Sequence, residues 1–205
     1  MSGDVILVHG LWMPRVAMTL LAARLARAGY RVHSFGYRGR APLASNIERL
    51  ARFTRERIDG QPAHFVGHSL GGVLVYDTLS RHPELASGHV VLLGAPVRGC
   101  HAGRHLGMRA LGRWLLGACA ARWHEHEARW SRHEPLGVIA GTLPLGLSRL
   151  LGALPGDNDG VVCVEETRID GMSDRALVRE PHSLLTVSPR VAALTARFLR
   201  AGRFA

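Results

Sequence analysis

The chain has 205 residues, of which 47% are hydrophobic and 20% are charged, a balance typical of one globular domain with a sizeable core. The formal net charge is +10, and lysine is absent, so that arginine carries the basic charge. The arginines are scattered over the predicted helices and are not gathered in one stripe with aromatic side chains. We therefore expect no nucleic-acid binding, and at most weak contact with an anionic membrane surface.

No stretch approaches the roughly 18 uninterrupted apolar residues of a membrane span. The N-terminus leads into a strand without the basic and apolar segments of a secretory signal. The cysteines Cys100, Cys119 and Cys163 are odd in number, widely spaced and without a metal-ligand pattern. We therefore expect a cytoplasmic protein with reduced thiols.

Short apolar runs alternate with helical patterns along the chain. Strands are predicted at residues 5–8, 30–35, 63–66, 89–93, 136–140 and 176–179. Helices are predicted at residues 14–28, 45–58, 72–82, 106–121 and 188–200. Ser45 and Glu48 form a capping box for the second helix, and Ser188-Pro189 is an N-cap and first-turn pair for the last. The alternation predicts an α/β fold whose parallel sheet is covered by helices on both faces.

One segment, at about residues 98–134, departs from this alternation and is rich in Arg, His and Trp. We expect one domain over residues 1–205, in which this segment is a helical excursion. Its tryptophans, Trp114, Trp123 and Trp130, suit ordinary packing, with a lid or a lipid-contacting surface as the alternative. The run 123–127 indicates a solvated helix face, because two histidines two residues apart on a helix point in different directions and cannot share a metal ion.

The pentapeptide Gly67-His68-Ser69-Leu70-Gly71 lies between a predicted strand and a predicted helix. This is the pattern of a nucleophile elbow, a sharp turn that exposes a serine hydroxyl and needs glycine two residues before and after it. We expect His68 to point to the other side of the turn in a structural role. Since a chain with 24 glycines can contain the pattern by accident, the interpretation depends on finding partners for Ser69.

A serine hydroxyl needs a general base to take its proton and a third group to orient that base. His182 follows the last predicted strand and is the expected base. Asp159 is the expected acid, with Asp157, Glu165 and Glu166 as alternatives. The same acidic loop leaves open a calcium site, although the glutamate and the spacing of an EF-hand are missing.

Acyl transfer also needs backbone N–H donors for the oxyanion. Leu70, directly after the serine, is one expected donor. Leu11, in the loop after the first strand, is the second. His9 is expected to shape this loop by hydrogen bonding, with direct proton transfer as the alternative. The neighbouring Trp12 and Met13 are candidates for lining an acyl pocket.

Together with Leu93-Gly94-Ala95-Pro96 and Pro181-His182, these motifs resemble the α/β-hydrolase superfamily, and within it the small bacterial lipases and esterases. The resemblance spans nearly the whole chain in the family's order. It implies a minimal α/β-hydrolase fold with a six-stranded, mostly parallel sheet. It also implies Ser69 as nucleophile, Asp159 and His182 as the rest of a triad, and Leu11 and Leu70 as oxyanion donors. The oxyanion loop lacks the run of glycines of some esterase branches, so the substrate class stays open.

The predicted function is cleavage of a carboxylic ester, in a small molecule or a lipid, through an acyl-enzyme and without a cofactor or a metal ion. Acyl transfer to an acceptor other than water and thioester hydrolysis use the same triad and remain alternatives. An inactive interaction protein with a hydrolase fold is less favoured, because all three triad positions are filled. The sequence predicts no oligomeric state.

Overall fold

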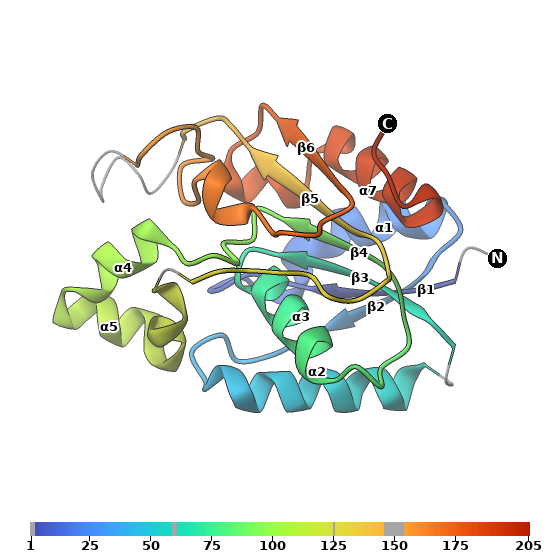
Figure 1. The fold of residues 1–205 in the computed structure, drawn as a ribbon, viewed down its shortest axis with the longest axis horizontal. Coiled ribbons are helices and arrows are strands. Elements are labelled where there is room, and N and C mark those ends of the chain that lie inside the picture. The colour runs from blue at the N-terminus through green and yellow to red at the C-terminus, as the bar shows by residue number, and fades with distance from the viewer. Residues whose placement is uncertain (1–2, 59–60, 125, 146–153) are drawn as a thin grey trace.

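The computed structural model describes residues 3–58, 61–124, 126–145 and 154–205, and its centre is a six-stranded sheet (Figure 1). The strands are β1 (Asp4–Val8), β2 (Arg31–Phe35), β3 (Ala63–His68), β4 (Ser87–Leu93), β5 (Leu136–Gly141) and β6 (Asp174–Val178). Their order in the sheet is β2-β1-β3-β4-β5-β6, and every neighbouring pair is parallel. The predicted α/β fold with six strands is confirmed, and the sheet is parallel throughout.

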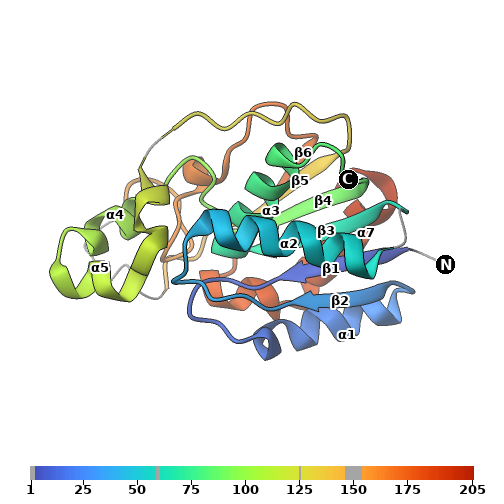
Figure 2. The ribbon, with the colours of Figure 1, turned by 90° about the horizontal axis from the view of Figure 1, so that it is seen from below.

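Helices cover both faces of the sheet (Figures 1 and 2). The helices α2 (Leu43–Arg57) and α3 (Leu70–Arg81) lie on one face. The other face carries α1 (Thr19–Arg27), which follows the 3-10 helix η1 (Arg15–Met18), and α7 (Pro189–Ala201). Because successive strand residues point to opposite faces, Ile6 packs under α2 and α3 while Val5 packs under α1 and α7. None of the described helices is long and apolar enough to cross a membrane.

The helix starts test two predictions about capping. The α7 helix begins as expected, because the Ser188 hydroxyl accepts a hydrogen bond from the Val191 N–H and Pro189 occupies the first turn. The capping box predicted for α2 is wrong. That helix begins at Leu43, directly after Pro42, and Ser45 lies inside its first turn. The φ of −52° at Pro42 directs the chain into the helix before Ser45 is reached.

The excursion between β4 and β5 is not the single helix predicted at residues 106–121. It forms α4 (His101–Gly107), α5 (Ala110–Leu116) and the 3-10 helix η2 (Gly117–Trp123). The prediction is wrong because the backbone is extended at Arg109 (φ −96°, ψ 145°) and left-handed at Gly117 (φ 65°). The short helices project beyond the carboxyl ends of the strands (Figures 1 and 2), on the side where the loops after β3, β5 and β6 also lie.

The tryptophans of the excursion differ in their surroundings. Trp123 and Trp130 are buried in the core that α2 and α3 cover, as ordinary packing predicts. Trp114, by contrast, is 61% exposed on α5. Two further 3-10 helices, η3 (Val164–Thr167) and η4 (His182–Thr186), follow β5 and β6.

A paired arginine holds the excursion against the body of the fold. Arg122 in η2 donates from Nε to Asp77 Oδ2 at 3.0 Å and from Nη2 to Asp77 Oδ1 at 3.1 Å. Its Nη1 also donates to the Val97 carbonyl oxygen at 3.2 Å. Both side chains are largely buried. Each charge has therefore lost most of its contact with water and is stabilised instead by the opposite charge of its partner.

We expect Arg122→Met to lower the free energy of unfolding by about 3 kcal/mol, because it leaves the Asp77 carboxylate without its partner in a place with little water. Urea unfolding at neutral pH measures this change. The matched control is Arg55→Met, which breaks an exposed pair with Glu84 and should cost less than about 1 kcal/mol. Equal losses in the two variants would contradict the anchoring role of Arg122.

Candidate active site

The turn between β3 and α3 holds Ser69 in a strained conformation. Its φ is 54° and its ψ is −127°. The Ser69 N–H donates to the Leu93 carbonyl oxygen at 2.9 Å, and the Ser69 carbonyl oxygen accepts from the Gly72 N–H at 2.9 Å. A Cβ at Gly67 would lie 2.5 Å from the Gly72 Cα, and a Cβ at Gly71 would lie 2.3 Å from the carbonyl oxygen of Val8. Both glycines are therefore required by the close approach of the backbone, as the elbow pattern predicts.

Positive φ is rare for residues with a side chain, and the two described residues that have it here line one cavity. Among the described residues, the only non-glycine residues with positive φ are Ser69 and Trp12, whose φ is 58°. Both line the same cavity at the carboxyl edge of the sheet. Backbone strain of this kind persists only where surrounding contacts hold it, and it is typical of functional sites.

The loops after β5 and β6 bring Asp159 and His182 together. The Asp159 Oδ2 lies 2.7 Å from His182 Nδ1, which donates to the carboxylate. The other carboxylate oxygen, Oδ1, accepts from the N–H groups of Val161 at 3.0 Å and Val162 at 2.7 Å. The His182 N–H donates to the Asp159 carbonyl oxygen at 2.9 Å. Asp159 is therefore fixed from three sides, and its carboxylate fixes the plane of the His182 ring.

The other acids considered for this role lie elsewhere. Asp157 and Glu165 are exposed. The Glu166 carboxylate accepts from the Cys163 N–H at 2.8 Å and from the His101 N–H, so it joins the acidic loop to the start of α4. The structure thus brings Asp159, and not these three residues, to His182.

A glycine at the end of β4 leaves room for the pair. Gly94 has a φ of 52°, and a Cβ there would lie 3.0 Å from Asp159 Oδ2 and 3.2 Å from His182 Nδ1. A side chain at this position would push the carboxylate and the imidazole apart. In the motif Leu93-Gly94-Ala95-Pro96, glycine is therefore needed at position 94 to avoid a steric clash with this pair.

The two expected oxyanion donors come from different strand ends. Leu70 is the first residue of α3, and Leu11 lies in the turn after β1. The turn lies against the serine, because a Cβ at Gly10 would be 3.1 Å from the Ser69 Cβ. The N–H groups of Leu11 and Leu70 make no loop or turn hydrogen bond within the described part of the chain. An oxyanion site requires N–H donors beside the nucleophile, and these two residues lie beside Ser69 in the fold.

His9 supports this turn. Its ring stacks on Tyr37 at a centroid distance of 4.6 Å, and its Nδ1 lies 2.9 Å from the Gly10 carbonyl oxygen. The Tyr37 hydroxyl donates to the His9 carbonyl oxygen at 2.8 Å. These contacts agree with the expected role of shaping the loop.

The expectation that His68 points away from the site is wrong. Its ring packs against the His182 ring at a centroid distance of 4.7 Å, and its Nε2 donates to the His182 carbonyl oxygen at 3.1 Å. The turn at Ser69 directs the serine and the preceding side chain to neighbouring positions under the loop after β6. Complete burial, with a smaller effect from the charge that His182 can carry, lowers the pKa of His68 to about 3. His68 is therefore neutral at physiological pH.

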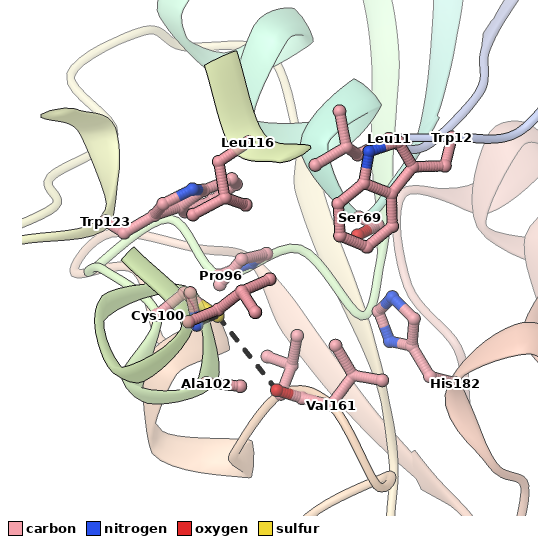
Figure 3. A pocket seen from close by; sticks show the side chains of 13 residues that line it. Leu11, Trp12, Ser69, Pro96, Cys100, Ala102, Leu116, Trp123, Val161 and His182 are labelled. Carbon is pink, nitrogen blue, oxygen red and sulfur yellow. Dashed lines mark hydrogen bonds between the residues drawn. The ribbon is translucent and has the colours of Figure 1, made fainter. Parts of the chain in front are cut away.

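A cavity of about 240 Å³ opens beside Ser69 (Figure 3). Figure 3 shows Ser69 and His182 at one end of it and Cys100 and Trp123 at the other. Its walls are almost entirely apolar and include Leu11, Trp12, Pro96, Leu106, Leu116 and Val161. Trp12 lies where an acyl-pocket residue was expected. Met13 does not, because the chain turns at Trp12 and Met13 lines a separate hollow with His9 and Arg38.

Sequence reasoning missed the far wall of this cavity. Leu106, Leu116 and Trp123 come from α4, α5 and η2, the elements whose bounds were predicted wrongly. The apolar pattern of the excursion indicated that these side chains would be buried, but it did not indicate that they would line a cavity beside Ser69. Cys100 also lines the cavity, and burial raises the pKa of its thiol, so the thiol is not an available nucleophile.

In the histidine-rich run 123–127, Glu125 lies outside the described residues, and the described residues after Trp123 are not helical. The expected helix is therefore wrong, although the expected exposure to solvent is confirmed for His124, His126 and Glu127. Trp123 ends η2 and is buried, while His124 and His126 are exposed in irregular chain. No group of three or more His, Cys, Asp or Glu side chains suited to a metal ion occurs in the described part of the chain.

Comparison with known proteins agrees with this geometry. The family model described as "Alpha/beta hydrolase family" matches residues 5–201. The chain belongs to the α/β-hydrolase family. A curated relative, a putative non-heme haloperoxidase of Mycobacterium phage D29, is 30% identical to this hydrolase over 99 residues. The match covers 44% of this chain and 36% of the relative, so it spans only about a third of the relative's length.

Solved structures share the fold of this α/β hydrolase. The mature lipase BlEst2 of Bacillus licheniformis has a TM-score of 0.76 at 16% identity, with 97% of this chain and 91% of that chain covered. A metagenomic carboxyl esterase has a TM-score of 0.71 at 20% identity, with 97% and 75% covered. The phospholipase PlaB of Legionella pneumophila has a TM-score of 0.63 at 18% identity, with 81% and 44% covered. At these identities the likeness concerns the fold alone.

The buried His68 makes this hydrolase sensitive to acid. In the unfolded chain His68 binds a proton below about pH 6.5, whereas in the folded protein it stays neutral to about pH 3. The unfolded state therefore binds more protons between these two pH values. The free energy of unfolding falls by up to about 1.4 kcal/mol for each unit by which the pH is lowered. We expect His68→Gln to lose less stability than the wild type between pH 6.5 and pH 5.

Urea unfolding at the two pH values measures this difference. The exposed His105→Gln serves as the control and should follow the wild type. If His68→Gln and the wild type lost stability in parallel, His68 would not be the buried neutral group that acid opposes.

Proposed function

We propose that this α/β hydrolase cleaves carboxylic esters through an acyl-enzyme formed on Ser69. The observation that carries the proposal is the 2.7 Å contact between Asp159 and His182, because His182 lines the same cavity as the strained Ser69. A serine on an elbow, an imidazole and a buried carboxylate together form the machinery of acyl transfer. The lipase and esterase folds similar to this chain agree with the same class of reaction.

In the first half of the proposed reaction, Ser69 Oγ attacks the ester carbonyl carbon while His182 Nε2 accepts the hydroxyl proton. Asp159 holds the ring through Nδ1 and stabilises the imidazolium. His182 then returns the proton to the leaving alcohol as the carbon–oxygen bond breaks. The acyl group remains on Ser69.

In the second half, His182 Nε2 takes a proton from water, and the resulting hydroxide attacks the acyl carbon. The bond between the acyl carbon and Ser69 Oγ then breaks, His182 Nε2 returns its proton to Ser69 Oγ, and the carboxylic acid leaves. Both tetrahedral intermediates place a negative oxygen near the N–H groups of Leu11 and Leu70. Each such donor is typically worth about 3 kcal/mol of transition-state stabilisation.

The cavity suggests which part of the ester it holds. Among the described residues, its lining includes no Asp, Glu or Arg side chain, so an acyl chain is the fitting occupant and a charged group is not. The volume of about 240 Å³ corresponds to a chain of medium length, since a water-sized unit takes about 30 Å³. Ala102 lies away from Ser69 in the cavity (Figure 3), and Leu106 of the same helix, α4, also lines it, so these side chains limit that length.

The catalytic roles are tested with a fluorophosphonate probe and a chromogenic ester. The probe should label the wild type and spare Ser69→Ala and His182→Ala, while turnover of the ester should fall by about six orders of magnitude in Ser69→Ala. Asp159→Asn should lower kcat by about four orders of magnitude, because the amide favours the wrong ring tautomer.

Two control variants accompany this test. Asp157→Asn changes an exposed carboxylate of the same loop, and His133→Ala removes an exposed histidine; both should keep nearly full activity. Labelling of a residue other than Ser69, or loss of activity in Asp157→Asn with Asp159→Asn active, would contradict the assignment.

The role of the cavity is tested with esters of increasing acyl length. Ala102→Phe should raise KM for an octanoate ester by about tenfold or more and leave acetate nearly unchanged, because the new ring occupies the distal cavity. Leu106→Ala enlarges the same region and should extend the series to longer chains. A uniform change for all esters in both variants would place the acyl chain elsewhere.

A further inference from the structure

The turn between α4 and α5, together with α5 itself, exposes three large apolar side chains. Met108 is 74% exposed, Leu111 is 68% exposed and Trp114 is 61% exposed. Leu111 and Trp114 are three residues apart on α5, so they lie on one side of that helix, and Met108 lies in the turn directly before it. We call these three residues the apolar ridge. Such a cluster on the outside of a soluble protein marks an interaction surface.

The opposite side of the same segment is already used inside the molecule. Leu106 and Leu116 line the cavity beside Ser69, and Gly112 is buried. The ridge is therefore a second apolar side, which this excursion does not bury against the rest of the described chain. The ridge belongs to the short helices that project at one end of the molecule (Figures 1 and 2).

Positive charge surrounds the ridge. The sequence contains no Asp or Glu from Leu85 to His124. Arg109 and Arg113 are exposed beside the ridge, and the Arg40 guanidinium lies 4.5 Å from the centre of the Trp114 ring. A hollow next to Met108 is lined by Arg104, His105 and Arg113. The surface thus combines an apolar centre with a cationic border.

We propose that the ridge docks on an anionic phospholipid bilayer. Tryptophan and aliphatic side chains enter the boundary between headgroups and acyl chains, while arginines beside them meet the phosphates. The position of the ridge on a projecting part of the molecule suits insertion into a fluid surface. A second copy of this chain fits less well, because it would place cationic borders against each other.

Docking would also bring the cavity to the lipid. The Trp12 Nε1 donates to the Leu115 carbonyl oxygen at 3.1 Å, so α5 is joined to the turn beside Ser69. Membrane docking does not depend on ester hydrolysis, and its test therefore uses the Ser69→Ala protein. Failure to bind vesicles would leave the catalytic proposal untouched, and the reverse also holds.

The experiment measures sedimentation of Ser69→Ala protein with phosphatidylcholine vesicles, with and without phosphatidylglycerol. We expect binding that requires phosphatidylglycerol and weakens with salt. Arg109→Glu should lower the partition coefficient by about fivefold or more, since each arginine near an anionic surface contributes about that factor. Arg197→Glu, an equal charge change on an exposed position of α7, should have a much smaller effect.

The apolar part is tested with Leu111→Ala combined with Trp114→Ala. This variant should lose most vesicle binding, whereas Leu20→Ala combined with Leu177→Ala, two exposed leucines on α1 and β6, should keep it. Circular dichroism checks that both double variants are folded. A Trp114→Phe protein should still bind but lose most of the blue shift of tryptophan emission on vesicles.

Three results would overturn the proposal. The first is equal loss of binding in Arg109→Glu and Arg197→Glu, which would mean attraction by net charge alone. The second is equal binding to vesicles without phosphatidylglycerol. The third is a dimer in solution that Leu111→Ala with Trp114→Ala dissociates, which would make a second copy the occupant of the ridge.

Discussion

The candidate site depends on how closely the start of α3 approaches the end of β1. A Cβ at Gly71 would lie 2.3 Å from the carbonyl oxygens of both Val8 and His9, so no side chain can stand there. This contact brings the Leu70 N–H and the turn that carries Leu11 to the same place, and it accompanies the strained φ of 54° at Ser69. Backbone packing, and not a side-chain interaction, therefore positions the proposed nucleophile and its oxyanion donors.

The parallel sheet supplies the rest of the constellation. Ser69 follows β3, Asp159 lies between β5 and β6, and His182 follows β6. Because all strands run in one direction, their carboxyl ends meet at one edge, where ligand sites of α/β sheets form. The glycine at the end of β4 leaves this edge open for the Asp159–His182 pair. His68 then fills the space behind the His182 ring as a neutral, buried group.

The sequence predicts this frame well because its signals are local and geometric. Apolar runs of strand length and the glycines Gly67 and Gly71 follow from short-range constraints, whereas the order of Ser69, Asp159 and His182 is what the resemblance to the α/β-hydrolase superfamily implies. The place of His68 could not be read in this way, since it depends on the loop after β6 that packs on it. Met13 was misplaced because a positive φ at Trp12, which no propensity suggests, turns the chain before it. The excursion was the hardest part, because its breaks accompany contacts distant in the sequence: α5 lies against α4 at Gly112 and Leu106, and Gly117 lies against the backbone of Arg40.

The excursion nevertheless forms part of the cavity beside Ser69 and the exposed surface next to it. Its inner side, through Leu106 and Leu116, closes the cavity, and its outer side carries the apolar ridge. Trp12 connects the two regions, because its indole bonds to the Leu115 carbonyl oxygen while its strained backbone lies next to Leu11. This hydrogen bond thus joins α5 to the turn that holds one proposed oxyanion donor. The serine elbow is held by backbone contacts, whereas the excursion is joined to the body of the fold through the side chains of Arg122 and Trp12. Substitutions in the excursion can therefore change the shape of the cavity without changing the backbone that holds Ser69.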